Sequence, residues 1–248
     1  MAFSSWRGTA GLVMPTMRPG AIEGLMRLLP EGISILPLYN NIRRGTREEL
    51  ESVMGGYETK VKELAEVGVD LIHPAGGPPF MVLGFEKERE LLRRWQQTYK
   101  IPMFTTGSID SEALRALQVK RFVGISYFTD DVNRLFVQYY RAAGFECIDI
   151  ASIGVAFDRM QELSETEIYR FARETFLAHP EAQGLYLLGS WHAERIIAMM
   201  EQDFGIPVVW SKAAQSWGIQ RFLHVREPLP GSGRLLAEMP DRPLRNEG

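Results

Sequence analysis

The feature that most constrains this chain is a pair of matched segments, one in each half of the sequence. The first runs from Ile72 to Pro78 and the second from Leu187 to His192. Each follows a helix-like stretch and an apolar run, and each precedes a further helical stretch and a strand that begins Ile-Pro, at Ile101 and at Ile206. A chain built on this repeat is expected to fold as two similar halves with a site between them.

Composition limits the class of protein. The chain has 248 residues, of which 45% are hydrophobic, and a formal net charge of -3. This is enough material for one large α/β domain or two small ones, and the charge is not basic enough for nucleic-acid binding. The longest apolar runs are far shorter than the roughly 20 residues that a membrane span needs. The N-terminus lacks the pattern of a secretory signal, so we expect a cytoplasmic protein, and its oligomeric state is left open.

Short apolar runs alternate with stretches of helical period, which predicts parallel sheets covered by helices on both faces. The expected strands are 11–14, 33–37, 69–73, 102–105, 122–126, 146–150, 184–188 and 207–210. The expected helices are 21–29, 47–67, 86–99, 110–117, 130–143, 165–178, 192–203 and 211–222.

The predicted fold is α/β, with two similar Rossmann-like halves and an active site in the cleft between them. The first half comprises residues 1–116 together with 225–248, and the second comprises 117–224. Residues 225–248 contain four prolines and are expected to form an extended strap and a loose tail.

In open α/β sheets, ligands bind beyond the carboxyl ends of the strands. Four strand ends are therefore expected to face one cleft, and they carry Pro15 and Thr16, Gly76 and Gly77, Tyr127, and Ser190 and Trp191. Arg18 and Lys212 are candidates for holding a carboxylate, and Trp191 for walling an apolar pocket. An ordinary surface position for the two cations and core packing for Trp191 are the alternatives.

The order of motifs resembles the aspartate/glutamate racemase superfamily, and within it the arylmalonate decarboxylase and maleate cis-trans isomerase branch. The resemblance covers nearly the whole chain, and its motifs are Gly11-Leu12-Val13-Met14-Pro15, the run from Tyr127 to Leu135, the strand Ile206-Pro207-Val208-Val209 leading to Trp217, and Pro230-Gly231-Ser232-Gly233-Arg234-Leu235. It implies that Tyr127 hydrogen-bonds a substrate carboxylate and that Pro15 lines the same pocket.

Both cysteine positions of this superfamily are substituted here. The racemases and maleate isomerases of the superfamily use two cysteines, one from each half, and the decarboxylases keep only the second. In this chain the first position looks like Gly76 and the second like Ser190. A thiol has a pKa of about 8.5 and is readily ionised, whereas an alcohol needs an adjacent base. The single cysteine, Cys147, is expected to be a packing residue.

The decarboxylases of this branch carry hydroxylic residues after the first-half glycine, where they stabilise an enediolate. Here Pro78 and Pro79 follow, and because proline has no N–H, this loop offers at most the amides of Gly76 and Gly77. His192, two residues past Ser190, and His73, three residues before Gly76, are the candidates for moving a proton at neutral pH. A structural hydrogen bond is the alternative for each histidine.

The sequence thus predicts a lyase or isomerase that acts on a small carboxylate through an enolate-like intermediate, with Tyr127 and the Gly76 and Gly77 amides holding negative charge and Ser190 or His192 handling the proton. No metal or other cofactor is expected, because the four histidines lack ligand spacing and no phosphate-binding glycine loop is present. Two alternatives remain at this point: a hydrolase of a small amide, ester or lactone with Ser190 as nucleophile, and a binding protein that has lost catalysis.

Overall fold

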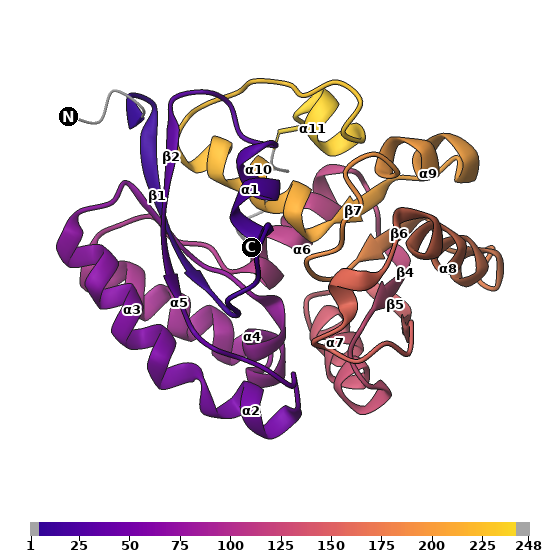
Figure 1. Cartoon of the computed structure of the whole chain (residues 1–248), viewed down its shortest axis with the longest axis horizontal. Coiled ribbons are helices and arrows are strands. Elements are labelled where there is room, and N and C mark those ends of the chain that lie inside the picture. Colours follow the sequence, from indigo (N-terminus) through magenta and orange to yellow (C-terminus); the bar gives the residue numbers. More distant parts are fainter. Residues whose placement is uncertain (1–4, 242–248) are drawn as a thin grey trace.

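The structure is a computed structural model, and it describes residues 5–241. Figure 1 shows two lobes side by side, each built around its own sheet, with α6 and α10 between them. The two sheets are parallel throughout, with strand orders β2-β1-β3 and β5-β4-β6-β7. This confirms the predicted α/β fold with two similar halves.

The first half begins with the central strand of its sheet and ends with the helix that faces the other half. Its strands are β1 (Gly8–Met14), β2 (Ile33–Tyr39) and β3 (Leu71–Pro74). Its helices are α1 (Ala21–Met26), α2 (Arg47–Ser52), α3 (Met54–Val67), α4 (Gly77–Leu83), α5 (Phe85–Tyr99) and α6 (Thr106–Ala116).

The second half repeats the order of strands. Its strands are β4 (Arg121–Ser126), β5 (Glu146–Ser152), β6 (Gly184–Leu187) and β7 (Val208–Trp210). Its helices are α7 (Asp130–Ala142), α8 (Glu165–Leu177), α9 (Ile197–Phe204) and α10 (Ser211–Phe222), with a short 3-10 helix η2 (Met160–Glu162) before α8 and a final helix α11 (Arg234–Glu238).

Three expectations about individual elements were wrong, and one helix was missed. The expected strand 102–105 is only a bridge between Met103 and Ile72, because Thr105 already caps α6 and so ends the extended segment. The expected helix 47–67 is two helices that meet at Val53. The expected helix 192–203 begins at Ile197. Helix α4 was not predicted, although Pro78 and Pro79 stand in its first turn, where no helical N–H is needed.

The segment after α10 is only partly a strap. It includes α11, whose Leu235 and Leu236 are buried, and Trp217 of α10 donates its indole N–H to the Pro240 carbonyl (3.2 Å). The expected loose tail from residue 242 onward lies outside the described residues. One cluster of buried side chains runs through both halves, so the core gives no boundary between them. The predicted division of the chain into domains, with 1–116 and 225–248 in one and 117–224 in the other, stays a prediction.

The pairing of β3 with β1 in the first sheet matches the pairing of β6 with β4 in the second. The first residue after β3, Ala75, donates its amide to β1 (2.9 Å), and the first residue after β6, Leu188, donates its amide to β4 (3.0 Å). Ala75 and Leu188 are therefore equivalent, and each is followed by a glycine with positive φ, Gly76 (93°) and Gly189 (112°). Residues with a side chain rarely adopt this backbone conformation, so both turns require glycine.

Buried side-chain contacts across α6 and α10 join the halves. Gln215 of α10 donates to His73 of β3 (2.6 Å), and Tyr186 of β6 donates to Asp110 of α6 (2.6 Å). Gln215 and Asp110 each lie four residues after the first residue of their helix, so these two contacts are equivalent under the internal repeat. They tie each strand to the helix of the opposite half.

Two carboxyl groups are buried at this interface. Glu88 of α5 accepts a hydrogen bond from Tyr139 of α7, and Asp110 accepts from Tyr186. Burial is the main cause that raises the pKa of both groups, from 4.5 to about 7 for Glu88 and from 3.8 to about 7 for Asp110.

Within residues 5–241, no helix has the length and apolar character needed to cross a bilayer.

Replacing Glu88 with Gln tests this burial. A raised carboxyl pKa means that the folded state favours the protonated form, so the stabilisation is complete below about pH 4 and is lost as the pH rises through about 7. We expect the unfolding free energy of the wild type to fall, relative to that of Glu88→Gln, by roughly 2 to 4 kcal/mol between these limits. Urea unfolding at several pH values measures this difference. Parallel pH profiles for the two proteins would contradict the raised pKa.

Candidate active site

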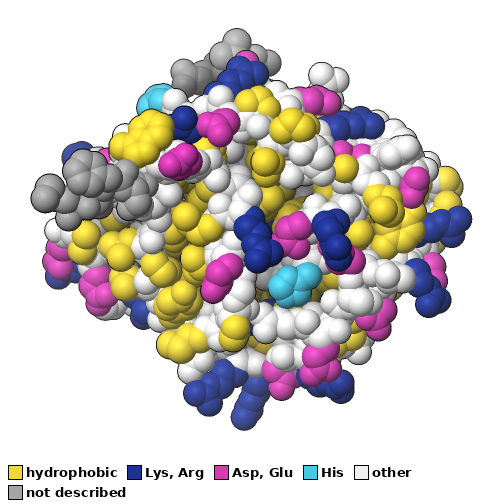
Figure 2. Space-filling view, turned by 45° about the horizontal axis from the view of Figure 1, so that its top comes forward, with side chains coloured by type: hydrophobic (Ala, Val, Ile, Leu, Met, Phe, Trp, Pro, Cys, Tyr) yellow, Lys and Arg dark blue, Asp and Glu magenta, His cyan; other side chains and the backbone are white. Residues whose placement is uncertain are grey.

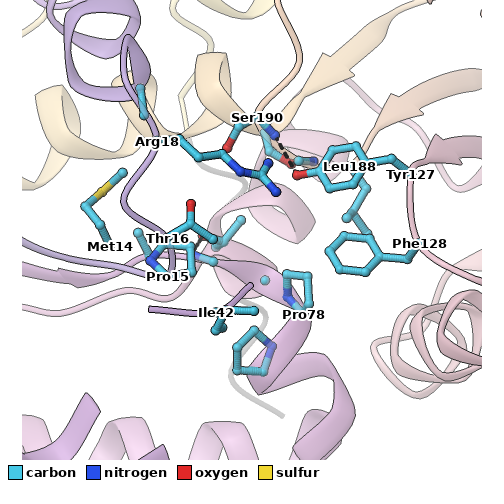
Figure 3. Close-up of a pocket in the computed structure, with 18 of the residues that line it drawn as sticks. Met14, Pro15, Thr16, Arg18, Ile42, Pro78, Tyr127, Phe128, Leu188 and Ser190 are labelled. Atoms are coloured by element: carbon cyan, nitrogen blue, oxygen red, sulfur yellow. Dashed lines mark hydrogen bonds between the residues drawn. The ribbon is translucent and has the colours of Figure 1, made fainter. Parts of the chain in front are cut away.

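A cavity lies between the halves, at the carboxyl ends of strands from both sheets. Its volume is about 70 Å³, large enough for a small organic anion and little more. Figure 3 shows residues of both halves around it, with Pro15 and Thr16 facing Tyr127 and Ser190. The predicted site residues that line it are Pro15, Thr16, Arg18, Gly76, Gly77, Tyr127, Ser190 and Lys212. The predicted convergence of four strand ends is therefore seen in the structure.

Tyr127 and Ser190 are in direct contact. The amide of Ser190 donates to the phenol oxygen of Tyr127 (3.2 Å), as the dashed line in Figure 3 marks. The phenol oxygen is the acceptor in this bond, so its own O–H is available to donate into the cavity. Tyr127 follows β4 in the same way that Pro15 follows β1, and the two side chains lie against the equivalent glycine turns, Gly189 and Gly76.

The structure does not bring two of the predicted residues to the cavity. Trp191 is fully buried, donates its indole N–H to the Leu188 carbonyl (2.9 Å) and meets the ring of Tyr127 edge-on from behind. It supports the wall without lining it, because its ring points into the core of the second half. His192 is half-buried in the turn before α9 and is not among the lining residues.

The other candidate histidine, His73, is a structural residue. It is fully buried, its Nδ1–H donates to the Phe104 carbonyl (2.8 Å), and its Nε2 accepts from Gln215 (2.6 Å). Burial lowers its pKa to about 4, so the ring is neutral at pH 7. Its effect on the site is to orient Gln215, which lines the cavity.

The register corrects the pairing of residues 76 and 190. Since Gly76 is equivalent to Gly189, Ser190 is equivalent to Gly77, one residue further along the chain. The consecutive glycines at 76 and 77 leave this register undetermined in the sequence, and only the strand hydrogen bonds fix it. Gly76, which looks like the first cysteine position, therefore has another glycine as its counterpart in the second half.

Each glycine turn is held by a hydroxyl group from the helix that follows the Ile-Pro segment. The amide of Gly76 donates to Thr106 Oγ1 (3.0 Å), and the amide of Gly189 donates to Ser211 Oγ (3.3 Å). The Gly76 amide therefore already has a partner in this structure, and its use for a ligand stays a prediction. The amide of Gly77, at the first position of α4, has no partner within its helix.

Sequence reasoning missed three polar lining residues: Thr106, Ser211 and Gln215. A signal for the first two was present. Thr106 lies five residues after Ile101, and Ser211 lies five residues after Ile206, so the matched Ile-Pro segments are followed by matched hydroxyl side chains. Gln215 carries no such signal, since its position on the cavity depends on the contact with His73.

The lining of the cavity is electropositive. It contains Arg18 and Lys212, and within the described chain no Asp or Glu contributes to it. Three helices also begin at the cavity, with Gly77, Thr106 and Ser211 as their first residues, and the first turn of a helix attracts negative charge. By contrast, Figure 2 shows a mixed outer surface on which Lys and Arg stand next to Asp and Glu.

The two cations are held in different ways. Lys212 is only 6% exposed, and its Nζ lies 3.1 Å from Oε1 of Glu194. Arg18 donates to the Phe157 carbonyl (2.7 Å), and its guanidinium carbon Cζ lies 4.2 Å from the centre of the Phe157 ring. Arg18 therefore joins a loop of the first half to a loop of the second. In Figure 3 its side chain extends across the cavity toward Tyr127.

Among residues 5–241, no Cys, His, Asp or Glu side chain lines the cavity. Cys147 is buried in β5, and burial raises the pKa of its thiol to about 12, as expected for a packing residue. Across residues 5–241, no three His, Cys, Asp or Glu side chains come together as a metal site would require. The reactive groups on the cavity wall are therefore hydroxyls, amides and two cations.

Comparison with known proteins gives one family. A sequence profile described as arylmalonate decarboxylase matches residues 11–236. A maleate isomerase of Pseudomonas putida (strain KT2440) is 21% identical over 235 residues, which cover 92% of this chain and 94% of that protein. An arylmalonate decarboxylase of Bordetella bronchiseptica is 23% identical over 196 residues, with 78% and 82% covered. The crystal structure of the maleate isomerase Iso from Pseudomonas putida S16 superposes with a TM-score of 0.86 at 19% identity, covering 94% of this chain and 99% of that one.

Alanine at Gly76 tests the close approach at the first glycine turn. A Cβ there would lie 2.8 Å from Cβ of Pro15 and 3.0 Å from the hydroxyl of Tyr57. Gly144 has a similar φ of 90° and nothing within 4 Å, so Gly144→Ala is a matched control for backbone strain alone. We expect about 1 to 2 kcal/mol of destabilisation for Gly144→Ala and about 1 to 3 kcal/mol more for Gly76→Ala, measured by urea unfolding. Equal losses would show that Pro15 does not pack on this turn.

Proposed function

This chain belongs to the arylmalonate decarboxylase family, and from that membership we propose that it is a lyase or isomerase acting on a small carboxylate through an enolate-like intermediate. The proton donor in this proposal is not a cysteine, and no cofactor takes part. The conserved α/β architecture is not the main support, because a fold hosts many activities. The support comes from the cavity itself.

The observation that carries the proposal is the electropositive cavity. Arg18 and the first residues of three helices line a space that has no lining carboxylate among residues 5–241. Lys212 also lines it, with its Nζ paired to Glu194. Loss of carbon dioxide from a malonate, or addition and rotation in a maleate, develops negative charge on the oxygens of the remaining carboxylate. Donors that are fixed in place before the reaction stabilise this charge most effectively.

Each lining residue has a proposed role that follows from its position. Tyr127 donates its phenol O–H to the substrate carboxylate, and the Gly77 amide adds a second donor from the opposite half. Lys212 and Arg18 supply positive charge at the wall, while Pro15 and Thr16 fix the depth of the cavity. Ser190, whose amide holds the Tyr127 oxygen, keeps its hydroxyl on the cavity side of the turn.

The positions of the two histidines argue against a hydrolase with Ser190 as nucleophile. A serine nucleophile needs an adjacent base, but both ring nitrogens of His73 are already hydrogen-bonded and His192 does not line the cavity. The binding-protein alternative predicts a cavity with the same ligand preference and no turnover. A direct assay separates it from the enzyme.

The test is turnover of a small panel by the purified chain. Disubstituted malonates, maleate and a small lactone are incubated with no added metal or nucleotide cofactor, and carbon dioxide release and product formation are followed by NMR. Turnover of a malonate or of maleate supports the proposal. Hydrolysis of the lactone alone, or carboxylate binding with no turnover, would contradict it in favour of one of the alternatives.

Tyr127→Phe removes the phenol donor and keeps the ring packing. We expect kcat/KM for the turned-over carboxylate to fall about 100-fold, because one preorganised donor to developing charge is lost. Tyr169→Phe is the control, since that hydroxyl bonds Asp203 away from the cavity (2.6 Å). Steady-state kinetics compares the two variants. If Tyr127→Phe retained wild-type kcat/KM, the assigned role of the phenol would be wrong.

A further inference from the structure

A buried acid lies directly behind the second glycine turn. Ser211, which lines the cavity, accepts the Gly189 amide and donates its own hydroxyl proton to Asp110 Oδ2 (2.8 Å). Tyr186 donates to the same oxygen (2.6 Å). Asp110 belongs to α6 of the first half, so this acid reaches the second-half wall of the cavity through a single hydroxyl group.

The surroundings of Asp110 favour its neutral form. The carboxyl group is fully buried, and its Oδ1 has no partner within the described chain. The titratable groups that face it are Tyr186 from β6, Glu88 from α5, and Tyr139 and Tyr140 from α7, and no cation is among them. Burial and then the nearby Glu88 raise the pKa of Asp110 to about 7, so it carries a proton in an appreciable fraction of molecules at neutral pH.

The equivalent place in the first half has no such acid. There Thr106 holds the Gly76 amide as Ser211 holds Gly189, but the residue equivalent to Asp110 is Gln215, which donates to His73. An amide cannot give up a proton at neutral pH. The internal repeat therefore provides a hydroxyl on both walls of the cavity and a proton reservoir behind only one of them.

We propose that Ser211 and Asp110 form a proton relay that serves the second-half wall of the cavity. The inference rests on the proposed function, since it needs a carbanionic intermediate in the cavity. When Asp110 is protonated, it donates to Ser211 Oγ, and the Ser211 O–H is then free to turn to the cavity. Ser211 gives this proton to the carbon of the enolate, a C–H bond forms, and Asp110 transfers its proton to the Ser211 oxygen. Asp110 is left as a carboxylate, held by Tyr186 as a positioning residue, and a solvent proton returns along the same path after the product leaves.

The relay links the charge of Asp110 to the ligand. An anion in the cavity lies close to Asp110 with only Ser211 between them, so bound negative charge disfavours the ionised carboxylate. Binding of malonate at about pH 8, above the pKa of Asp110, is therefore expected to take up a proton. This linkage does not require turnover.

Proton uptake is measured by titration calorimetry of malonate binding in two buffers that differ in ionisation enthalpy. We expect a substantial fraction of one proton for the wild type and nearly none for Asp110→Asn. Glu88→Gln is the comparison variant, because Glu88 is an equally buried carboxyl group that bonds Tyr139 instead of a lining residue. Since Glu88 raises the pKa of Asp110, proton uptake in Glu88→Gln is expected to persist but to be largest at a lower pH. Proton uptake that persists in Asp110→Asn would overturn the relay.

A second experiment measures steady-state kinetics with the carboxylate that is turned over in the substrate panel described above. The protonated acid is the active form, so kcat/KM of the wild type is expected to fall as the pH rises through about 7. Ser211→Ala and Asp110→Asn should each lose at least about 100-fold, and Tyr169→Phe, whose lost hydroxyl bonds Asp203 away from the cavity, should keep wild-type activity. Tyr186→Phe removes a hydrogen bond to Asp110 that lowers the pKa of its carboxyl group. The fall of kcat/KM with rising pH should therefore occur at higher pH in this variant.

The outcomes separate the relay from the proposed function. Turnover that survives Ser211→Ala, or a falling limb that Tyr186→Phe does not move, overturns the relay and leaves the lyase or isomerase activity standing. Failure to bind malonate together with failure to turn over any carboxylate of the panel overturns the proposed function, and the relay with it.

Discussion

The site depends on one contact that the chain makes twice: the amide of a glycine turn donates to the hydroxyl that begins the helix after the Ile-Pro segment of the same half. Gly76 with Thr106 and Gly189 with Ser211 place two backbone turns against the same cavity. Positive φ at both glycines lets the chain turn from strand to cavity within one residue, and the absence of a Cβ lets Pro15 and the Tyr127 phenol approach closely. Without these contacts the strand ends would converge but the donors would not be fixed.

The electrostatics follow from the same arrangement. Because each hydroxyl is the first residue of its helix, the positive ends of α6 and α10 point at the cavity together with Lys212. The acid that accompanies this charge, Asp110, is placed one hydroxyl away from the cavity. In the proposed function, this cavity binds the carboxylate and stabilises developing negative charge without a thiol, and the proton comes from an oxygen acid.

Much of the architecture could be predicted from the sequence. The alternation of strand and helix appears in the structure as expected, and the two Ile-Pro segments occupy matching places, although only the second forms a strand. Local signals of this type are strong because they arise from backbone hydrogen bonding near each residue. Pro78 and Pro79 misled because prolines suggest a loop, although the first turn of a helix accepts them.

The site was predicted less completely, because its details depend on contacts between residues far apart in the chain. Nothing near Gln215 in the sequence reveals that His73 orients it, and nothing near Asp110 reveals that Ser211 and Tyr186 meet its carboxyl group. The same limit explains His192, which shares a turn with Ser190 in sequence yet does not line the cavity.

The most direct test of this account is a crystal structure of the chain with malonate bound. The account predicts that one carboxylate lies between the phenol of Tyr127 and the Gly77 amide, with the central carbon facing Ser211. Malonate bound elsewhere on the molecule, with the space between Tyr127 and Gly77 occupied only by water, would contradict it.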